Sequence, residues 1–415
     1  MNGFDVMTSR SRSIWLSLTI VALVAGAGAL VARRGFRPPP DLQPICALAR
    51  EGDFGRAQNL LVRYLRAYPD DDRARLLMAQ LAMDRPDPDP QLALEQLRLI
   101  RSSTPQEGAV VRFSEGKAHY QQKRYDLAEI CWNEALDLDP AVPEAGWALI
   151  DLLDFERRPE EAHRLAMKLF EVEPDPQDRV RLLLEMARLD LDTVAPGSTV
   201  QVFEPVWRKN PGYLPLALAV GLALVHNSQA SEGIVVLRDA LRRHPDSPEA
   251  WDGWLTGLDK ANQPGLLSQE FHRLPKALAK DPRFAKHEGN VAQACGDWAR
   301  AVKAYRRAVD FEPFNGAGQY RLRMALQAAG ETPEREQTDQ VLGAGRKALE
   351  QLRPVYAQAR AIKTLGLEPD PELYQRLAGL REQMGRIDEA RAWHRLVLRD
   401  LPDNALSLAA LARLK

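Results

Sequence analysis

A ladder of small, aromatic and proline residues recurs along this chain at matching gaps. In "GDWARAVKAYRRAVDFEP" the ladder consists of Gly296, Trp298, Ala301, Tyr305, Ala308 and Pro313. The segments that begin at Gly52, Lys123 and Gly385 repeat these gaps, and the closing prolines Pro140 and Pro174 lie one repeat apart. A period near 34 residues is typical of a helix-turn-helix repeat. The chain is therefore predicted to be a row of stacked helix pairs.

Each slot of the ladder has a physical role in such a pair. Glycine or a polar residue ends the first helix, because a left-handed backbone costs glycine little. Alanine lies where the two helices approach most closely. The next two positions of the ladder continue the buried face of the second helix, and proline ends that helix. The first helix also needs a small residue at the crossing. That residue is supplied by Gly116, Gly221, Gly289 and Ala378.

With these spacings the chain resembles a tetratricopeptide repeat protein over most of residues 42–415. The resemblance implies an all-α, right-handed helical solenoid, with one solenoid segment at 42–332 and a terminal repeat with a capping helix at 371–415. The units are expected at about 38–71, 72–107, 109–142, 143–176, 180–213, 214–247, 248–281, 282–315, 316–332 and 371–404. The last helix, from residue 404, would cover the apolar face of the final repeat.

The N-terminus departs from this pattern. Residues 14–32 carry no charge and are long enough to cross a bilayer core as a helix. A single transmembrane anchor after a tail at 1–13 is favoured over a cleaved signal, and the proline-rich residues 33–41 form a stiff linker. Ala22 and Gly26 offer a contact between two such helices, which leaves a homo-oligomer as an unsupported alternative. Arginines flank the segment on both sides, so orientation stays open, with the extracytoplasmic side preferred for the solenoid.

Residues 333–370 break the repeat rhythm. Thr332 and Pro333 open a long helix with acidic residues in its first turn, and Pro354 is expected to kink or break it. Two interpretations remain: an elongated second helix of the preceding repeat, or a helical insertion that docks a partner.

Composition and motifs point away from catalysis. Positive and negative side chains nearly cancel to a net charge of −1, which argues against a nucleic-acid partner. Seven scattered histidines form no helical zinc pair, and no phosphate loop or nucleophile elbow occurs. The three cysteines lie far apart and are expected to be buried apolar residues. We therefore expect no enzyme activity, no cofactor and no metal site.

Binding is the default function, because stacked helix pairs form a concave groove lined by the first helices. The resemblance places partner contacts at fixed positions of each repeat. These are Phe113, Lys117, Trp147, Asp151, Leu222, Lys286 and Asn290, with Gln121, Asp154, Leu218, His226 and Gln293 beside them. Phe113 and Trp147 could form an aromatic shelf, although a shift of register by one residue would bury Trp147. Lys286 and Asn290 match half of the family's clamp for a C-terminal carboxylate, but Arg321 stands where the clamp needs asparagine.

Two functions are consistent with these features. The preferred one is a membrane-anchored, noncatalytic scaffold that binds a protein or peptide partner in its groove during assembly of a bacterial-type envelope complex. The alternative is a noncatalytic regulatory or accessory subunit of an enzyme, docked through residues 333–370.

Overall fold

The computed structural model describes residues 41–101, 104–140, 142–191, 196–364 and 370–414. The predicted tail, the anchor at 14–32 and nearly all of the linker lie outside these residues. Across the described segments no helix is both long and apolar enough to cross a membrane. The described residues fall into two compact units, one within Met1–Ala145 and the other within Gly146–Lys415. Both are all-α over the described residues, so the predicted helical solenoid class is confirmed.

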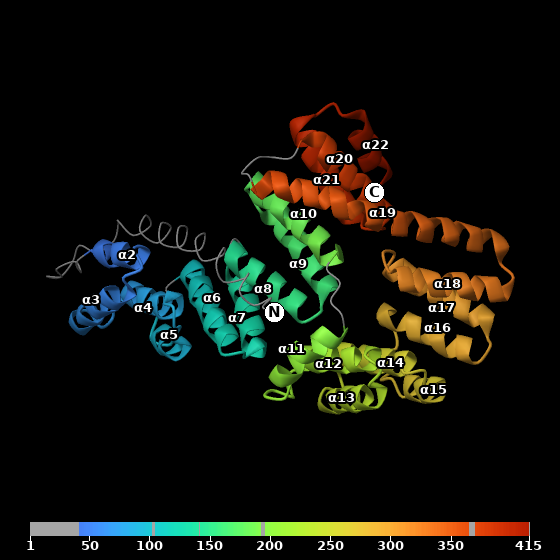
Figure 1. The fold of residues 1–415 in the computed structure, drawn as a ribbon, viewed down its shortest axis with the longest axis horizontal. Helices are drawn as coiled ribbons and strands as arrows, with labels where there is room; N and C mark the ends of the chain where they lie inside the picture. Colours follow the sequence, from blue (N-terminus) through green and yellow to red (C-terminus); the bar gives the residue numbers. More distant parts are fainter. Residues whose placement is uncertain (1–40, 102–103, 141, 192–195, 365–369, 415) are drawn as a thin grey trace. The chain divides into compact units, whose positions relative to one another are not determined.

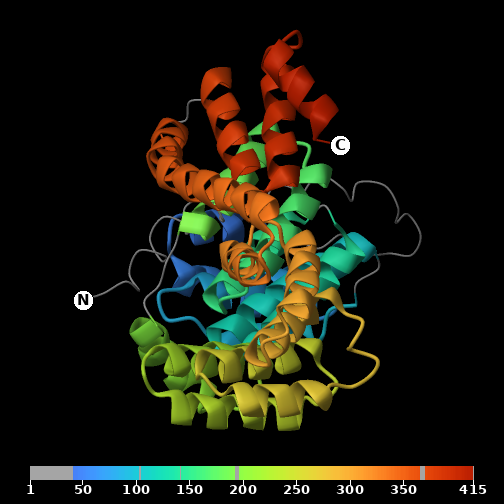
Figure 2. The same cartoon turned by 90° about the vertical axis from the view of Figure 1, so that its right-hand side faces the viewer.

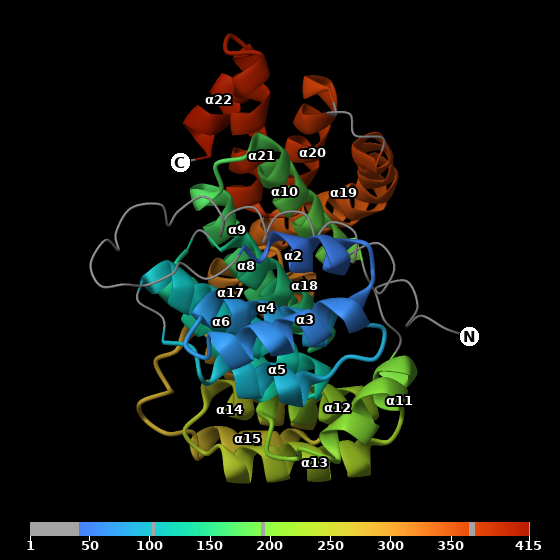
Figure 3. The same cartoon turned by 90° about the vertical axis from the view of Figure 1, so that its left-hand side faces the viewer.

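Unit 1 consists of antiparallel helix pairs stacked in chain order. Its helices are α2 (Gln43–Arg50), α3 (Phe54–Ala67), α4 (Asp72–Asp84), α5 (Pro90–Leu97), α6 (Pro105–Gln121) and α7 (Tyr125–Leu138). Each helix packs against the next, as the neighbouring α3, α4 and α5 show in Figure 3. Leu61 and Tyr64 on one face of α3 join Leu77 of α4 in a shared apolar core. The amphipathic period of 3.6 thus buries one face of every helix.

Unit 2 continues the same pattern over more pairs (Figure 1). Its helices are α8 (Pro143–Phe155), which begins at the end of unit 1, α9 (Pro159–Val172), α10 (Pro176–Leu191), α11 (Pro196–Trp207), α12 (Leu214–His226), α13 (Ala230–Arg243), α14 (Pro248–Lys260), α15 (Pro264–His272), the short 3₁₀ helix η1 (Pro282–Phe284), α16 (Ala285–Ala294), α17 (Trp298–Phe311), α18 (Gly316–Ala329), α19 (Thr332–Thr364), α20 (Pro371–Gln383), α21 (Ile387–Asp400) and α22 (Ala405–Arg413). The even-numbered helices α8 to α20 are the first helices of their repeats.

The turn between the two helices of a repeat recurs with one backbone geometry. Gly52, Gly296 and Gly385 have φ near +80° there, in the left-handed region that glycine adopts easily. Lys123 and Ser228 adopt the same conformation without being glycine. The prediction that this slot ends the first helix with a left-handed residue is confirmed.

The predicted small residues lie at the helix crossings. A side chain at Gly116 would collide with the indole of Trp132, and one at Gly289 would collide with the ring of Tyr305. At Gly221 the side chain of Leu237 occupies the same space. Glycine lets the two helices of each pair approach until an aromatic or leucine side chain fills the gap left by the missing Cβ.

The helix α19 departs from the regular stack of helix pairs because it is 33 residues long. It includes Pro354 without interruption, so the break expected at this proline does not occur. Leu352, Val355 and Ala359 are buried on one face of α19, which packs against α18, α20 and also α10 (Figure 2). Unit 2 therefore returns on itself, because α10 lies far earlier in the chain than α19.

The cysteines follow the expectation from sequence only in part. Cys46 and Cys131 are buried, and burial raises the pKa of the Cys131 thiol to about 11. Cys295 is exposed, which corrects the expectation that all three are core residues. It lies at the C-terminal end of α16, where the helix leaves its packed face.

Candidate functional site

The first helices of unit 2 contact one another directly, with α12 beside α14 and α14 beside α16. Each second helix packs behind its own first helix, as α13 does on α12 and α17 on α16. Helices on the inside of a curved stack lie closer together than those outside, so the first helices form the concave side. We call their side chains on this side, from α8 to α18, the concave wall.

Neighbouring repeats are cross-linked along the concave wall at equivalent positions. Arg188 of α10 lies 2.8 Å from the carboxylate of Asp154 on α8, and 34 residues separate them. Two turns earlier, the guanidinium of Arg181 lies over the ring of Trp147 at 4.3 Å from its centroid. Trp147 is half-buried rather than fully exposed or fully buried. The predicted aromatic contact surface of Trp147 is thus largely covered by an arginine from the next repeat.

Asp151 lies between these two links and remains exposed. No ion pair joins its carboxylate to a side chain of the described residues. Shielding by the surrounding concave wall raises the pKa of Asp151 to about 6, and the charge of Glu185 on α10 adds to the effect. Its side chain is open to solvent while helices on both sides exclude much of the bulk water, which is the situation of a group on the floor of a groove. A cation supplied by a partner would stabilise this carboxylate.

Lys286 is already neutralised within the wall. Its Nζ lies 2.8 Å from Oδ1 of Asp252 on α14, again 34 residues away, and His287 Nε2 lies 2.7 Å from the same oxygen. Burial alone would raise the pKa of Asp252, but the hydrogen bond from His287 and the charge of Lys286 lower it to about 2. Lys286 therefore stabilises its own fold at this position and would have to leave Asp252 to bind a partner.

Asn290 is also committed to internal contacts. Its side-chain oxygen accepts hydrogen bonds from Tyr305 (2.9 Å) and from Arg321 (2.9 Å), and Arg321 reaches Asp259 at 2.6 Å. Lys286, Asn290 and Arg321 line a hollow of about 120 Å³. Two carboxylates already occupy the cations that would bind a C-terminal carboxylate, so the structure does not present an open clamp.

Two predicted contact residues lie in unit 1. Phe113 is 7% exposed, and its backbone oxygen accepts a hydrogen bond from the Trp132 indole. This burial corrects the prediction that Phe113 forms an aromatic shelf, because its ring is packed inside the repeat. Lys117 lies 5.9 Å from the Phe113 centroid and 3.7 Å from a carboxylate oxygen of Asp84 on α4. It cross-links α6 to α4 as Arg188 cross-links α10 to α8.

Leu222 is half-buried and packs against the apolar core around Trp254 and Leu258. Its role in partner binding stays a prediction, as it does for Lys117, Trp147, Asp151, Lys286 and Asn290. What the structure adds is their present environment: most of these side chains bridge neighbouring repeats.

Two exposed residues of the concave wall were not among the predicted contacts. Tyr320 and Met324 of α18 are 54% and 39% exposed, and they lie one helical turn apart on one face. They stand at the same repeat positions as Lys286 and Asn290, 34 residues further on. The spacing that selected Lys286 would have selected them too, had it been extended to the unit that begins at Gly316.

A second set of wall residues, Arg181, Glu185 and Arg188, was also absent from the predicted contacts. This repeat was expected to begin at residue 180, whereas α10 begins at Pro176. One period after the unit at 143 is residue 177, so a unit placed at 180 has its groove positions three residues too late and misses Arg181 and Glu185. Adding one repeat length to Trp147, Asp151 and Asp154 would have found all three.

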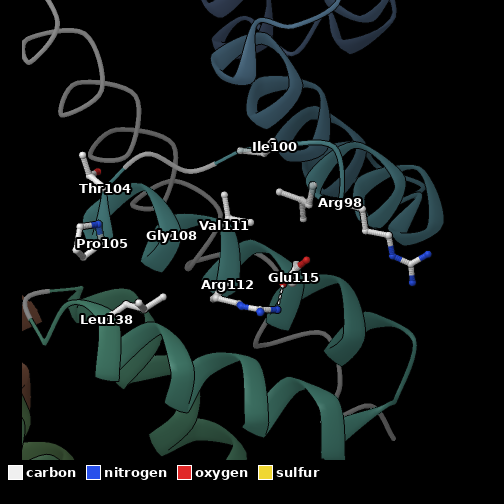
Figure 4. Close-up of a pocket in the computed structure, with 10 residues that line it drawn as sticks. Arg98, Ile100, Thr104, Pro105, Gly108, Val111, Arg112, Glu115 and Leu138 are labelled. Carbon is white, nitrogen blue, oxygen red and sulfur yellow. Dashed lines mark hydrogen bonds and ion pairs between the residues drawn. The ribbon is translucent and has the colours of Figure 1, made fainter.

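A separate hollow of about 500 Å³ lies in unit 1 (Figure 4). It exists because α5 has only 8 residues where α3 and α7 each have 14, so α6 is left partly uncovered. Val111 and Leu138 line it, and Arg112 on its edge is paired with Glu115 at 2.8 Å. No predicted contact residue is among the described residues that line this hollow.

The family comparison matches only the first part of the chain. Models described as tetratricopeptide repeat match residues 45–108 and 109–142. Tetratricopeptide repeats are therefore present over residues 45–142. These repeats generally mediate protein–protein interaction.

One curated relative is similar over a short stretch. It is "Cellulose synthase operon protein C" from Pseudomonas fluorescens (strain SBW25), 27% identical over 116 residues. The match covers 26% of this chain and 9% of the relative, so the chain spans less than a tenth of that protein.

Solved structures show similarity at low identity. A tetratricopeptide repeat protein from Parabacteroides merdae is 10% identical, with 74% of this chain and 99% of that chain covered and a TM-score of 0.29. The human IFIT1 dimer with m7Gppp-AAAA is 13% identical, with 85% and 95% covered and a TM-score of 0.36. We draw no functional conclusion from either similarity.

Proposed function

We propose that this protein is a noncatalytic, membrane-anchored scaffold whose concave wall in unit 2 binds a protein or peptide partner. The observation that carries the proposal is the contrast within that wall. Most of its charged side chains are paired across repeats, whereas Asp151, Tyr320 and Met324 are left exposed. Exposed aromatic and methionine side chains next to satisfied polar groups are typical of binding anchors.

The membrane anchor in this proposal is the uncharged run at residues 14–32. We place the solenoid on the extracytoplasmic side and the function in assembly of an envelope complex. The short similarity to a protein named for a cellulose synthase operon is consistent with this setting. The partner itself is to be identified by the experiment below.

A second candidate function uses α19. Val341 and Leu349 on this helix are 45% and 40% exposed, although another face of α19 packs against α10. These two side chains offer an apolar surface for an enzyme that the protein would regulate. Deleting residues 333–370 would test this poorly, because it would also remove the contact between α19 and α10.

Crosslinked affinity capture of the full-length protein from its native membranes tests both functions. The concave-wall variant is Asp151→Arg with Tyr320→Ala and Met324→Ala, and the α19 variant is Val341→Asp with Leu349→Asp. Val235→Ala on the second helix α13 is the matched control, since Val235 is 64% exposed and lies away from the concave wall.

If the concave wall binds the partner, the concave-wall variant recovers at least about tenfold less of it, while the control and the α19 variant keep it. Loss with the α19 variant alone would favour the regulatory subunit. A partner retained by both variants would contradict both functions.

A further inference from the structure

A cluster of charged side chains joins the two ends of unit 2. His163 of α9 lies 2.8 Å from Glu389 of α21, a residue 226 positions later in the chain. Asp190 at the end of α10 lies 2.6 Å from Arg381 of α20 and 2.7 Å from Arg386 in the turn before α21. We call His163, Asp190, Arg381, Arg386 and Glu389, together with Glu160, the clasp.

Apart from Glu160, whose side chain is 36% exposed, the clasp is buried, unlike most ion pairs among the described residues. The side chains of Arg381, Glu389 and His163 are 0%, 5% and 5% exposed. Removing charges from water is costly, and they are tolerated only when their partners are in the right places. The clasp therefore fixes one arrangement of α20 and α21 on α9 and α10 and disfavours neighbouring ones.

The charge balance of the clasp depends on one proton. Arg381 and Arg386 are permanently positive, while Asp190, Glu389 and Glu160 are three carboxylates. When His163 is protonated, three positive groups face three negative groups. When His163 is neutral, only one of its two ring nitrogens carries a proton, so the other nitrogen faces a carboxylate oxygen with no hydrogen to donate, which is unfavourable in a buried site.

The charged groups that face His163 within the described residues all enter this balance. Asp190 approaches its Nε2 from α10 at 3.3 Å, and Glu389 approaches its Nδ1 from α21. Arg386 is the cation that opposes its protonation, and it is held by Glu160 of α9 at 2.7 Å as well as by Asp190. Two carboxylates in direct contact outweigh this one cation.

We propose that the clasp is a proton-dependent lock, which holds α20 and α21 against α9 and α10 when His163 is charged and loosens when His163 is neutral. The pKa values agree in direction. Burial alone would lower the pKa of His163, but the contacts with Asp190 and Glu389 raise it above its ordinary value. Burial would raise the pKa of Glu389, but Arg381 and His163 lower it.

The direction of the pH effect follows from these shifts. A histidine whose pKa is raised in the closed form stabilises that form at low pH and loses this contribution as pH rises through its pKa. The carboxylates of Asp190 and Glu389 have lowered pKa values, so their contribution is lost only well into the acid range. The clasp is thus closed in mildly acidic solution and loosens as pH rises through the raised pKa of His163.

Loosening would affect a second contact of the same turn. The guanidinium of Arg386 lies over the ring of Phe314, 3.9 Å from its centroid, in the segment between α17 and α18. Arg386 therefore links the terminal repeat to α9 and to the start of α18, which carries the exposed Tyr320. The lock is a change between two conformations of this chain alone. Its test therefore does not depend on whether the proposed partner exists.

Distance measurement between spin labels on the full-length protein tests the lock. The labels replace Lys168 on α9 and Arg391 on α21 through Lys168→Cys and Arg391→Cys, with Cys295→Ser to remove the exposed native thiol. One short distance is expected at about pH 6, and a second, longer distance should gain population as pH is raised to about 9. An unchanged distance distribution over this range would overturn the proposal.

Two variants separate the lock from general pH effects. His163→Gln is neutral at every pH, so it should show the longer distance throughout and lose the pH dependence. Arg395→Gln removes the exposed pair with Glu171 on the same two helices and should behave like the wild type. If Arg395→Gln alone abolished the pH response, the buried clasp would not be the lock.

A measurement on the wild type covers the case in which His163→Gln does not fold. The imidazole of His163 can be titrated by NMR with isotope-labelled histidine. Its midpoint should lie above about 6.5, the ordinary value for histidine, and should coincide with the distance change. A midpoint below that value, or one that does not match the distance change, would contradict the proposal.

Discussion

Arg188 and Asp154 lie at the same position of two successive repeats, and their side chains meet at 2.8 Å across the space between α10 and α8. Asp252 and Lys286 repeat this relationship between α14 and α16. The repeat period brings residues 34 positions apart to the same height on neighbouring first helices. Opposite charges at that spacing therefore act as cross-links between repeats.

This relationship predicts that Arg188→Ala destabilises unit 2 by about 1.5–3 kcal/mol, because Arg188 contacts both Asp154 and Glu185 in a half-buried setting. Arg242→Ala is the control: Arg242 contacts Asp239, but its side chain is 78% exposed, so a loss below about 1 kcal/mol is expected. Urea unfolding followed by circular dichroism measures both. Equal losses in the two variants would contradict a cross-linking role.

Asp151 makes stability depend on pH in a predictable direction. Its pKa is raised to about 6 in the folded protein, so the folded state holds a proton that the unfolded state has released between about pH 4 and pH 6. Stability from this group is present below that range and is lost as pH rises through it. Asp151→Asn should therefore be more stable than the wild type at about pH 7.5, by about 1 kcal/mol after allowance for solvent exposure, and equal to it near pH 4.

Urea midpoints at the two pH values test this prediction. Asp310→Asn on α17 serves as the control, because Asp310 is exposed on a second helix and away from the concave wall. A gain at neutral pH in both variants would show that the effect comes from net charge and not from the position of Asp151.

The left-handed conformation at the turn of each repeat predicts that removing a glycine there lowers stability and introducing one raises it. Gly296 has φ +75° and open space where a Cβ would be, so Gly296→Ala should cost about 1 kcal/mol from backbone strain alone. Lys123 is exposed and has φ 61°, so Lys123→Gly should relieve strain and stabilise the protein by roughly 0.5–1 kcal/mol. Thermal unfolding of the two variants checks the signs, and a loss in Lys123→Gly would contradict the common turn geometry.

The local parts of the fold were predictable because they are set by residues close in sequence. Gly289 and Tyr305 belong to one helix pair, and the ladder places both of them from spacing alone. Cross-repeat contacts such as Arg188 with Asp154 were also within reach, since they follow from the period. The main error was the expected start of the repeat that contains α10. Because that start was placed too late, Arg181 and its neighbours were not recognised as residues of the concave wall.

The clasp could not be predicted in this way. His163 and Glu389 are 226 residues apart, and their meeting depends on the summed curvature of all intervening repeats and on the direction of α19. A small change in the angle between successive repeats, accumulated over the stack, would separate them. No local spacing in the sequence encodes that sum.

The helix crossings that have glycine leave no room for a Cβ. Gly289→Ala would place a Cβ against the Tyr305 ring, which is fully buried and held by hydrogen bonds to Asn290 and Gln293. A cost of about 1–3 kcal/mol is expected. Gly343→Ala in the middle of α19 meets nothing within 4 Å and should stabilise by about 1 kcal/mol through helix propensity. Opposite shifts of the two thermal midpoints support close crossing as the cause, and a neutral Gly289→Ala would contradict it.

Arg381 provides the strongest contrast between a buried and an exposed charge on this protein. Its side chain is 0% exposed and contacts Asp190 and Glu389, so Arg381→Ala leaves two buried carboxylates without their principal cation and should cost about 3–5 kcal/mol. Arg395→Ala removes a pair with Glu171 in which both side chains are about half exposed, and a loss below about 1 kcal/mol is expected. Urea unfolding followed by circular dichroism measures the two losses under identical conditions. Because unit 2 returns on itself, the Arg381→Ala loss should appear as earlier unfolding of α20 and α21, and similar losses in the two variants would show that burial of the clasp contributes little.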